Sequence, residues 1–231
     1  MKSIVRAWLA PPLVLVAAAA GCGGGGGERE ANAFDDRQQR TTSAPSVPPS
    51  RGERLVSALR RGGHVIYFRH TATDWGQDDE YPVVLSDCDT QRNLSPAGRR
   101  QARAIGEAIE TLDIPIGRVL SSPFCRALDT ARLAFGRGRP EAGLENLENA
   151  ESDTESERRT GRLRRLLSAT PARGTNRVLT GHGYNIQAVR NGTGSEEGDA
   201  EIFRPRRGPG FALVATVTPA EWQQLARRFG G

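Results

Sequence analysis

Short apolar runs and segments of helical period alternate along the chain from about residue 52 to its end. The most compact apolar run covers residues 65–68 and is followed by polar residues. Four apolar residues in succession, two of them β-branched, are typical of a short strand buried on both faces of a parallel sheet. Similar short runs predict further strands at residues 118–120, 177–180, 201–203 and 211–217.

Apolar residues at helical spacing predict helices between these strands. One helical segment begins at Ser95-Pro96, an N-cap residue followed by proline at the first helical position. The last begins at Thr218-Pro219-Ala220-Glu221, which has the pattern of a capping box. Strands that alternate with helices predict an α/β fold, a three-layer α/β/α sandwich with a mostly parallel sheet.

The N-terminal residues 1–21 have the pattern of a secretory signal peptide. Lys2 and Arg6 precede an apolar stretch over residues 7–20, which is short for a transmembrane helix. The stretch ends in Ala19-Ala20-Gly21-Cys22, which resembles the lipobox of bacterial lipoproteins, with Ala19 where Leu or Val is commoner. This resemblance implies cleavage before Cys22, lipidation of Cys22 and an extracytoplasmic location at the cell membrane. The alternative is an ordinary signal peptide followed by an incidental cysteine.

Residues 22–51 contain a run of glycines and then polar, proline-rich sequence. Such a composition buries no core, and we expect a flexible tether that holds the folded domain, residues 52–231, away from the membrane. The whole chain has 231 residues with 37% apolar residues and a net charge of +5. This length suits one medium-sized domain after processing, and the charge favours anionic ligands. A nucleic-acid partner is not expected, because no basic stripe is interleaved with aromatic residues.

Charged and ionisable side chains follow two of the predicted strands. Arg69 and His70 end the first strand, and His182 follows the strand at residues 177–180. Ligands of open α/β sheets bind at the carboxyl ends of the strands, so these side chains are delivered to the place where chemistry is expected. An arginine can bind an oxyanion through two hydrogen bonds, and a neutral histidine can attack phosphorus. His64, which opens the first strand, is expected to be structural.

A long polar segment over residues 71–93 separates the first strand from the next helix. A segment of this length without periodicity is often a functional loop. We expect it to lie over the site, with Trp75 or Tyr81 shaping a substrate pocket. The alternative for both aromatic residues is ordinary packing within the loop.

Four motifs occur in order, at residues 69–73, 94–102, 121–131 and 181–183. Their residue types and spacing resemble the histidine phosphatase superfamily and its phosphoglycerate-mutase-like fold, over about residue 52 to the C-terminus. The sequence departs from the family in one place: Thr71 stands where the family has glycine, while Thr73 is kept. Thr71 adds bulk beside the predicted nucleophile, which bears on substrate choice more than on chemistry.

The resemblance implies a role for each matching residue. His70 is the nucleophile that forms a phosphohistidine, which water then hydrolyses. Arg69, Arg126 and His182 form the phosphate pocket, and Thr73 contributes to substrate binding. Two guanidinium groups and a histidine supply the charge that phosphoryl transfer needs, so neither a metal nor another cofactor is expected.

The proton donor for the leaving group stays open. Some branches of the family place the acid after the second arginine helix, which here indicates Glu148 or Glu151. Others place it directly after the second histidine, where this chain has Gly183. Glu197, ahead of the predicted strand at residues 201–203, is an equal candidate to Glu151. Family members that act on protein phosphohistidine need no such acid, because their leaving group is already good.

Two cysteines remain once Cys22 is lipidated, and an oxidising compartment favours their pairing. Cys88 lies in the long loop and Cys125 precedes Arg126, so both are expected near the phosphate pocket. We predict a Cys88–Cys125 disulfide that pins the loop to the second arginine helix. The alternative is two separate, partly buried thiols.

The sequence therefore predicts a lipid-anchored extracytoplasmic phosphatase that hydrolyses a small phosphomonoester, or a phosphohistidine, through an intermediate on His70. The alternative is a lipoprotein that keeps the fold for anion binding or interaction without catalysis. A mutase is disfavoured, because an exported enzyme of that kind lacks an obvious supply of its phosphorylated intermediate.

Overall fold

The computed structural model describes residues 50–190, 194–206, 208 and 210–231. The predicted signal peptide, Cys22 and residues 22–49 of the predicted tether lie outside these residues. Lipidation, membrane attachment and location therefore stay predictions. Within the described residues, no helix combines the length and apolar character needed to cross a bilayer.

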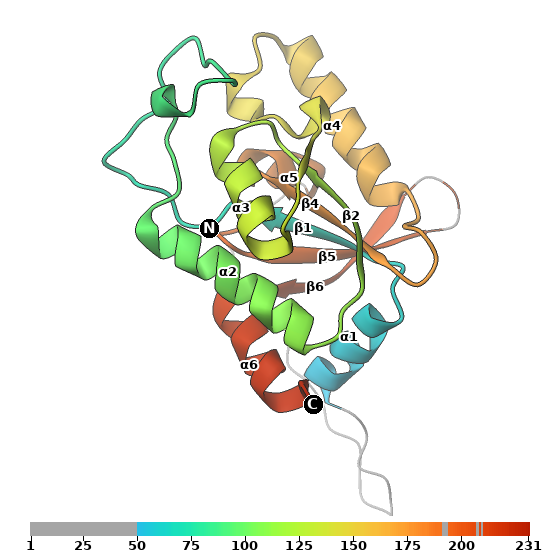
Figure 1. Ribbon diagram of the computed structural model, residues 1–231. Helices are drawn as coiled ribbons and strands as arrows, with labels where there is room; N and C mark the ends of the chain where they lie inside the picture. Colours follow the sequence, from blue (N-terminus) through green and yellow to red (C-terminus); the bar gives the residue numbers. More distant parts are fainter. Residues whose placement is uncertain (1–49, 191–193, 207, 209) are drawn as a thin grey trace, which may run out of the picture. The chain divides into compact units, whose positions relative to one another are not determined.

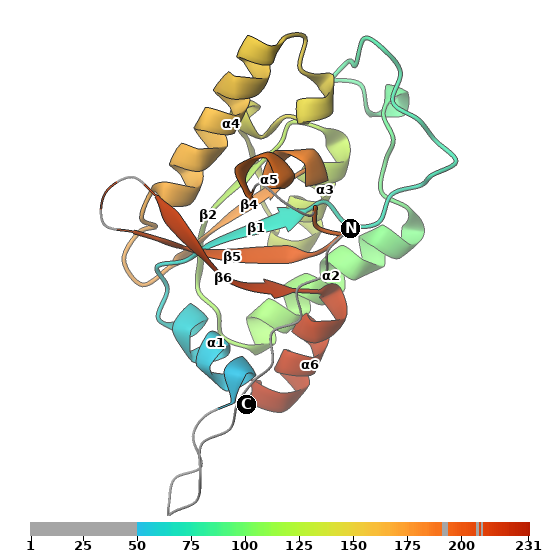
Figure 2. The ribbon, with the colours of Figure 1, turned by 180° about the vertical axis from the view of Figure 1, so that it is seen from behind.

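A single mixed sheet runs through the described domain, in the strand order β3-β2-β4-β1-β5-β6 (Figure 1, Figure 2). The strands β1 to β4 pair in parallel, and β5 and β6 add two antiparallel pairings on one side. The mostly parallel sheet that the sequence predicts is confirmed. The strands are β1 (Val65–Arg69), β2 (Ile116–Ser121), β3 (Arg139–Pro140), β4 (Asn176–Gly181), β5 (Ala200–Pro205) and β6 (Phe211–Val217).

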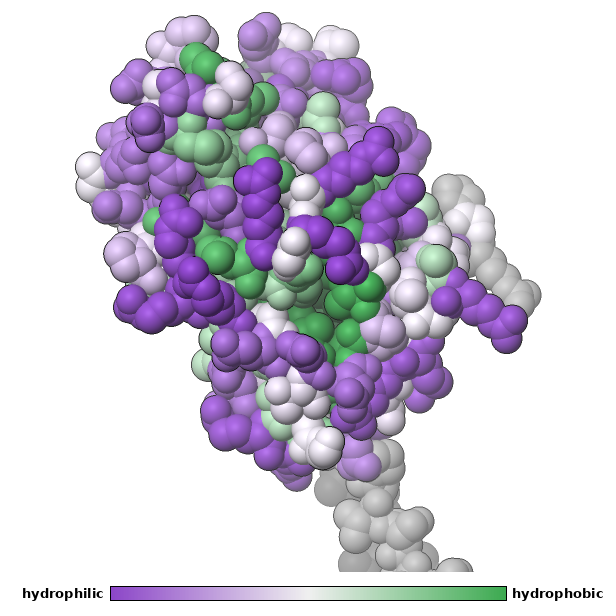
Figure 3. Space-filling model, viewed as in Figure 1, coloured by the Kyte–Doolittle hydropathy of each residue, from purple (hydrophilic) through white to green (hydrophobic). Residues whose placement is uncertain are grey.

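Helices cover both faces of this sheet, which makes the three layers that the sequence predicts (Figure 1, Figure 2). One face packs against α1, α2, α3 and α6, and the other against α4 and α5. The helices are α1 (Arg51–Arg60), α2 (Pro96–Thr111), α3 (Cys125–Phe135), α4 (Asp153–Ser168), α5 (Gly183–Arg190) and α6 (Pro219–Phe229). Hydrophilic residues dominate the face shown in Figure 3, with apolar residues in a smaller area near its centre.

The central strand β1 divides its side chains between the two layers, because successive side chains of a strand point to opposite faces. Ile66 and Phe68 belong to one core, and Val65 and Tyr67 to the other. All four are at most 1% exposed, as expected for a strand covered on both sides. His64 lies at the other end of β1 from His70, where Asn176 accepts a hydrogen bond from its backbone N–H.

The start of α2 fixes the loop that follows His70. Ser95 caps this helix by accepting a hydrogen bond from the Gly98 backbone N–H at 3.0 Å. The first turn packs directly on the loop backbone, since a Cβ atom at Gly98 would collide with the Ala72 carbonyl oxygen. Glycine is therefore required here by close approach of two backbone segments.

The acid-rich stretch at residues 141–157 is more ordered than its composition suggests. Its second half begins α4 at Asp153, with Ser152 as the N-cap accepting from the Glu155 N–H at 3.2 Å. Acidic residues in a first turn interact favourably with the positive end of the helix dipole, so this charge run marks a helix start. The short strand β3 was also not evident from the sequence, because it contains only two residues.

Candidate active site

A cavity of about 340 Å³ opens at the carboxyl ends of β1 and β4. Arg69, His70, Arg126 and His182, the four residues predicted to handle the phosphoryl group, all line it. They come from places far apart in the chain: the end of β1, the first turn of α3, and the residue after β4. The parallel pairing of β1 with β4 sets Arg69 beside Gly181, and this brings the two histidines to the same edge.

His70 is held with one ring nitrogen free. Its backbone N–H donates to the Gly181 carbonyl at 2.9 Å, and its Nδ1 lies 3.1 Å from the Thr71 carbonyl oxygen. A carbonyl only accepts, so Nδ1 carries the proton and Nε2 keeps its lone pair. Burial, and after it the charge of Arg126, holds the pKa of His70 well below its ordinary value of 6.5. The ring is therefore neutral near pH 7.

His182 lies beside His70, with 5.5 Å between the ring centroids. Its backbone is fixed by the buried Tyr67 hydroxyl, which is 2.8 Å from both the N–H and the carbonyl oxygen of His182. Its Nε2 is 2.9 Å from the Ser122 hydroxyl. If this hydroxyl donates, Nδ1 carries a hydrogen and can itself donate. Burial and then Arg126 lower the pKa of His182 well below 6.5.

Arg126 is 1% exposed and stands in the first turn of α3. Its two terminal nitrogens donate to the carboxylate of Asp79 at 2.8 and 3.1 Å. The guanidinium also lies 4.6 Å from the centre of the Phe124 ring. Burial lowers the pKa of Arg126, while hydrogen bonding to Asp79 opposes that shift.

A third arginine, Arg92, lines the cavity and was not among the residues predicted from sequence. Its guanidinium carbon lies 4.2 Å from the centre of the Trp75 ring, and its backbone N–H donates to Asp79 at 2.8 Å. The sequence feature that could have indicated Arg92 is its position. It lies at the end of the long loop, two residues before Leu94, which opens the second motif. Periodicity does not mark such a residue.

The buried donors around this cavity are incompletely paired. The Nε atoms of Arg69, Arg92 and Arg126 and the Nδ1 atom of His182 have no hydrogen-bond partner among the described residues. Buried polar groups are nearly always paired in proteins, so four exceptions that border one cavity need an explanation. The three arginines and His182 all line the cavity, and such a lining suits an anion with several acceptor oxygens.

Glu197 lies next to the histidine but off the cavity lining. Its two carboxylate oxygens accept hydrogen bonds from the Thr73 hydroxyl at 2.6 Å and from the Thr73 N–H at 3.1 Å. One oxygen is also 3.9 Å from His70 Nδ1 and from Arg69. This is the protonated side of the ring, opposite the free Nε2. The Thr73 hydroxyl donates its hydrogen to Glu197. This position of the hydroxyl does not favour the predicted contact of Thr73 with substrate.

The other two candidates for the proton donor, Glu148 and Glu151, differ in the cavities that they line. Glu148 lines the cavity of His70 and also a neighbouring cavity, whereas Glu151 lines the neighbouring cavity and not that of His70. The charge of Glu148 is among those that raise the pKa of Arg126. Among the described residues, no three or more His, Cys, Asp or Glu side chains are grouped to hold a metal ion.

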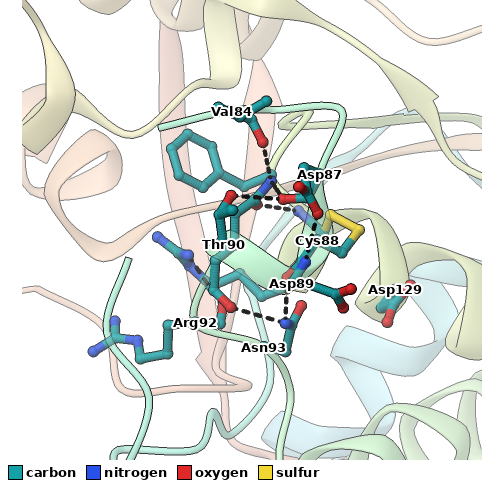
Figure 4. Close-up of a disulfide and its surroundings, with 12 residues drawn as sticks. Val84, Asp87, Cys88, Asp89, Thr90, Arg92, Asn93 and Asp129 are labelled. Carbon is teal, nitrogen blue, oxygen red and sulfur yellow. Dashed lines mark hydrogen bonds between the residues drawn. A yellow bond between two sulfur atoms is a disulfide. The ribbon is translucent and has the colours of Figure 1, made fainter. Parts of the chain in front are cut away.

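The long loop is fastened to α3 at several points. Cys88 and Cys125, the pair predicted from sequence, are joined by a disulfide (Figure 4). The buried Gln91 side chain accepts from the Cys125 backbone N–H at 3.0 Å and donates to the carbonyls of Val84 and Asp87. Because Phe124 gives α3 no side-chain cap, Gln91 serves this helix end from the loop.

The loop side chains differ in what they reach. Trp75 lines the cavity and is 68% exposed, while Tyr81 lines the neighbouring cavity that contains Glu151. Thr71 is fully buried, and its hydroxyl lies 3.2 Å from that of Thr130 on α3. The extra bulk of Thr71 is therefore directed at α3.

Comparison with known families identifies the segment that carries the first three motifs. Residues 65–149 match the histidine phosphatase superfamily (branch 1). The matched segment covers less than half of the chain. It contains Arg69, His70 and Arg126, and His182 lies beyond it. No curated protein matches the chain.

Several solved structures of phosphatases are similar to the chain. A complex of the protein histidine phosphatase SixA with tungstate has 14% identity, covers 68% of this chain and 97% of its own, and has a TM-score of 0.48. A mycobacterial glucosyl-3-phosphoglycerate phosphatase has 17% identity, coverage of 66% and 97%, and a TM-score of 0.48. The alpha-ribazole phosphatase from Shigella flexneri has 16% identity, coverage of 65% and 94%, and a TM-score of 0.48.

Proposed function

We propose that the protein is an extracytoplasmic, lipid-anchored phosphatase that hydrolyses a small phosphomonoester through a phosphohistidine on His70. The observation that carries this proposal is that Arg69, Arg92, Arg126 and His182 line one cavity together with the neutral His70, whose Nδ1 is committed to the Thr71 carbonyl. A phosphoryl group has the oxygens to occupy those donors and the electrophilic phosphorus that the histidine needs.

In the first step, the Nε2 lone pair of His70 forms a bond to phosphorus, and the bond from phosphorus to the ester oxygen breaks. The leaving oxygen takes a proton from a carboxylic acid. We assign this acid to Glu148, because among the three candidates its side chain alone lines the cavity. In the second step, water attacks phosphorus, the phosphorus–nitrogen bond breaks, and the Glu148 carboxylate accepts the proton of the water. Inorganic phosphate and the neutral His70 ring result.

The charge developed on the phosphoryl oxygens is met by fixed cations. Arg69, Arg92 and Arg126 all line the cavity, and positioned cations are the main source of catalysis in phosphoryl transfer. Two of these guanidiniums are already oriented before substrate binds: Arg69 by the Ser195 carbonyl at 2.7 Å and Arg126 by Asp79. This arrangement supports a reaction that needs no metal ion.

The proposed location rests on the sequence of residues 1–22, with its basic start, apolar stretch and lipobox-like end. The Cys88–Cys125 disulfide supports it, because disulfides persist mainly in oxidising compartments outside the cytoplasm.

A trapping experiment tests the mechanism. Brief incubation with labelled phosphomonoester and an alkaline quench should leave label on the wild-type chain that is stable to base and released by acid. His70→Ala should trap none and show no turnover of p-nitrophenyl phosphate. His64→Asn, a histidine change at the opposite end of the same strand, serves as the matched control and should trap label normally. Arg69→Ala and Arg126→Ala should each lower kcat by roughly 10²-fold to 10³-fold.

Three outcomes would contradict the proposal. Retained turnover in His70→Ala would exclude the phosphohistidine route. Loss of activity on addition of EDTA would show that a metal takes part. Phosphate binding by the wild-type protein without any turnover would favour the non-catalytic, anion-binding alternative.

A further inference from the structure

The way in which Asp79 holds Arg126 leaves one edge of the guanidinium unused. Asp79 occupies both terminal nitrogens, Nη1 at 2.8 Å and Nη2 at 3.1 Å, and Nη1 also lies 3.3 Å from the Arg92 carbonyl oxygen. A guanidinium has five N–H donors in a rigid plane. Three are therefore used, and the two that remain are Nε–H and the second hydrogen of Nη2.

These two remaining donors are parallel neighbours. In arginine, Nη2 is the terminal nitrogen on the same side as the Nε–H bond, so the two hydrogens form a second fork beside the one that Asp79 fills. The Nε atom is buried and has no partner among the described residues. Arg126 is thus prepared to bind an oxyanion along its Nε–Nη2 edge while its far end stays on Asp79.

Asp79 is itself fixed, as a positioning group must be. Its side chain is 10% exposed, and one of its oxygens also accepts the Arg92 backbone N–H at 2.8 Å. The loop that carries it is tied to α3 by the Cys88–Cys125 disulfide (Figure 4). Gln91 adds a second attachment, because its side chain accepts a hydrogen bond from the Cys125 N–H. Both partners of the ion pair are therefore held by the same element, α3.

We propose that Asp79 is the positioning residue of the phosphate site, which orients Arg126 so that its Nε–Nη2 edge receives the phosphoryl group. This inference rests on the proposed function, because it assumes that Arg126 binds that group. It gives the long loop a part in catalysis besides shaping the cavity. It also keeps one of the three cations in the cavity paired, so that the buried charge is partly balanced before substrate enters.

The opposite arrangement would be competition, in which the Asp79 carboxylate occupies the position of the phosphoryl group and must be displaced by it. The two arrangements predict opposite changes in phosphate affinity when the Asp79 carboxylate is removed. If Asp79 positions Arg126, its removal weakens phosphate binding and slows turnover. If Asp79 competes, its removal strengthens phosphate binding.

The test compares Asp79→Asn with wild type in hydrolysis of p-nitrophenyl phosphate and in competitive inhibition by inorganic phosphate. We expect kcat/KM to fall at least roughly tenfold and the inhibition constant for phosphate to rise, because the charged fork is lost. Asp78→Asn makes the same charge change one residue earlier, at an exposed position, and should behave as wild type. Asp79→Glu, which restores the carboxylate, should recover part of the loss.

A double-variant cycle separates positioning from a merely structural role. Lysine cannot be held through two nitrogens, so in an Arg126→Lys background the further change Asp79→Asn should alter kcat/KM less than about twofold. An equal loss in both backgrounds, or tighter phosphate inhibition in Asp79→Asn, would overturn the inference. Melting curves of each variant identify any loss of activity that comes from unfolding. If Asp79→Asn unfolds, the comparison of Asp79→Glu with wild type decides the question. If wild type neither turns over p-nitrophenyl phosphate nor binds phosphate, the proposed function itself fails.

Discussion

At the scale of single residues, the site depends on a histidine that is kept neutral by its surroundings. Burial and the charge of Arg126 lower the pKa of His70, and its Nδ1–H is committed to the Thr71 carbonyl. The same causes act on His182. A nucleophile with a lowered pKa stays unprotonated in mildly acidic solution, where a free imidazole would be charged.

The first prediction concerns the pH dependence of turnover. The acid limb of kcat/KM should lie below pH 6.5, after correction for ionisation of the substrate, because protonation of His70 in the folded protein requires a lower pH than in a free imidazole. Rates measured between pH 4 and 9 on a phosphomonoester check this. An acid limb well above pH 6.5 would contradict the neutral-nucleophile arrangement.

The second prediction concerns the proton donor. Glu148→Gln should slow hydrolysis of an alkyl phosphate by roughly 10²-fold and affect p-nitrophenyl phosphate little, because nitrophenolate leaves without a proton. Glu151→Gln should leave the hydrolysis rates of both substrates unchanged, since Glu151 lines the neighbouring cavity. Glu197→Gln should slow both substrates alike, as Glu197 holds Thr73 beside His70. A selective effect of Glu151 or Glu197 on the alkyl phosphate would move the assignment.

At the scale of elements, the loop over residues 71–93 is a fastened part of the site. Its Trp75 and Arg92 line the cavity, and its Asp79 holds Arg126. The Cys88–Cys125 disulfide and Gln91 join the loop to the start of α3. The placement of these side chains therefore depends on a covalent connection outside the cavity lining.

The third prediction follows from this connection. Cys88→Ser together with Cys125→Ser should lower the free energy of unfolding by about 2–4 kcal/mol and should also lower kcat/KM, because the loop loses its attachment beside Arg126. Urea unfolding and steady-state kinetics measure the two effects. A titration of unfolded, unreduced wild-type protein should find no reactive pair of thiols at these positions. Two titratable thiols would refute the bridge.

The strands and their terminal residues could be predicted from the sequence, because apolar runs that end in Arg69-His70 and before His182 reveal both the element and its functional edge. The partners in the loop could not. Asp79 and Arg92 lie in a loop whose sequence has no helical or strand periodicity. Their contacts with Arg126 form only when this loop folds. The sequence also could not choose the proton donor among Glu148, Glu151 and Glu197. That choice depends on which of these carboxylates lines the cavity, and only the folded structure shows this.

At the scale of the whole molecule, the predicted lipid attachment and the proposed catalytic residues lie in different parts of the chain. The site is built entirely from residues after β1 begins, whereas the predicted lipid attachment is at Cys22. The fourth prediction is that Cys22→Ser releases the protein from the detergent phase while its kcat/KM on p-nitrophenyl phosphate is unchanged. Phase partitioning of the two proteins checks this. Membrane retention of Cys22→Ser would exclude the lipoprotein assignment.

The pairing of β1 also determines when the cavity can form during synthesis. β1 is the first strand of the sheet to be made, yet both of its neighbours, β4 and β5, are made late. Tyr67 and its hydrogen-bond partner His182 are 115 positions apart. Contacts over such separations form slowly, and a chain that stops before β4 has His70 without the strand that places it. The ribosome must therefore complete both β4 and β5 before the edge of the sheet that carries His70 can assemble.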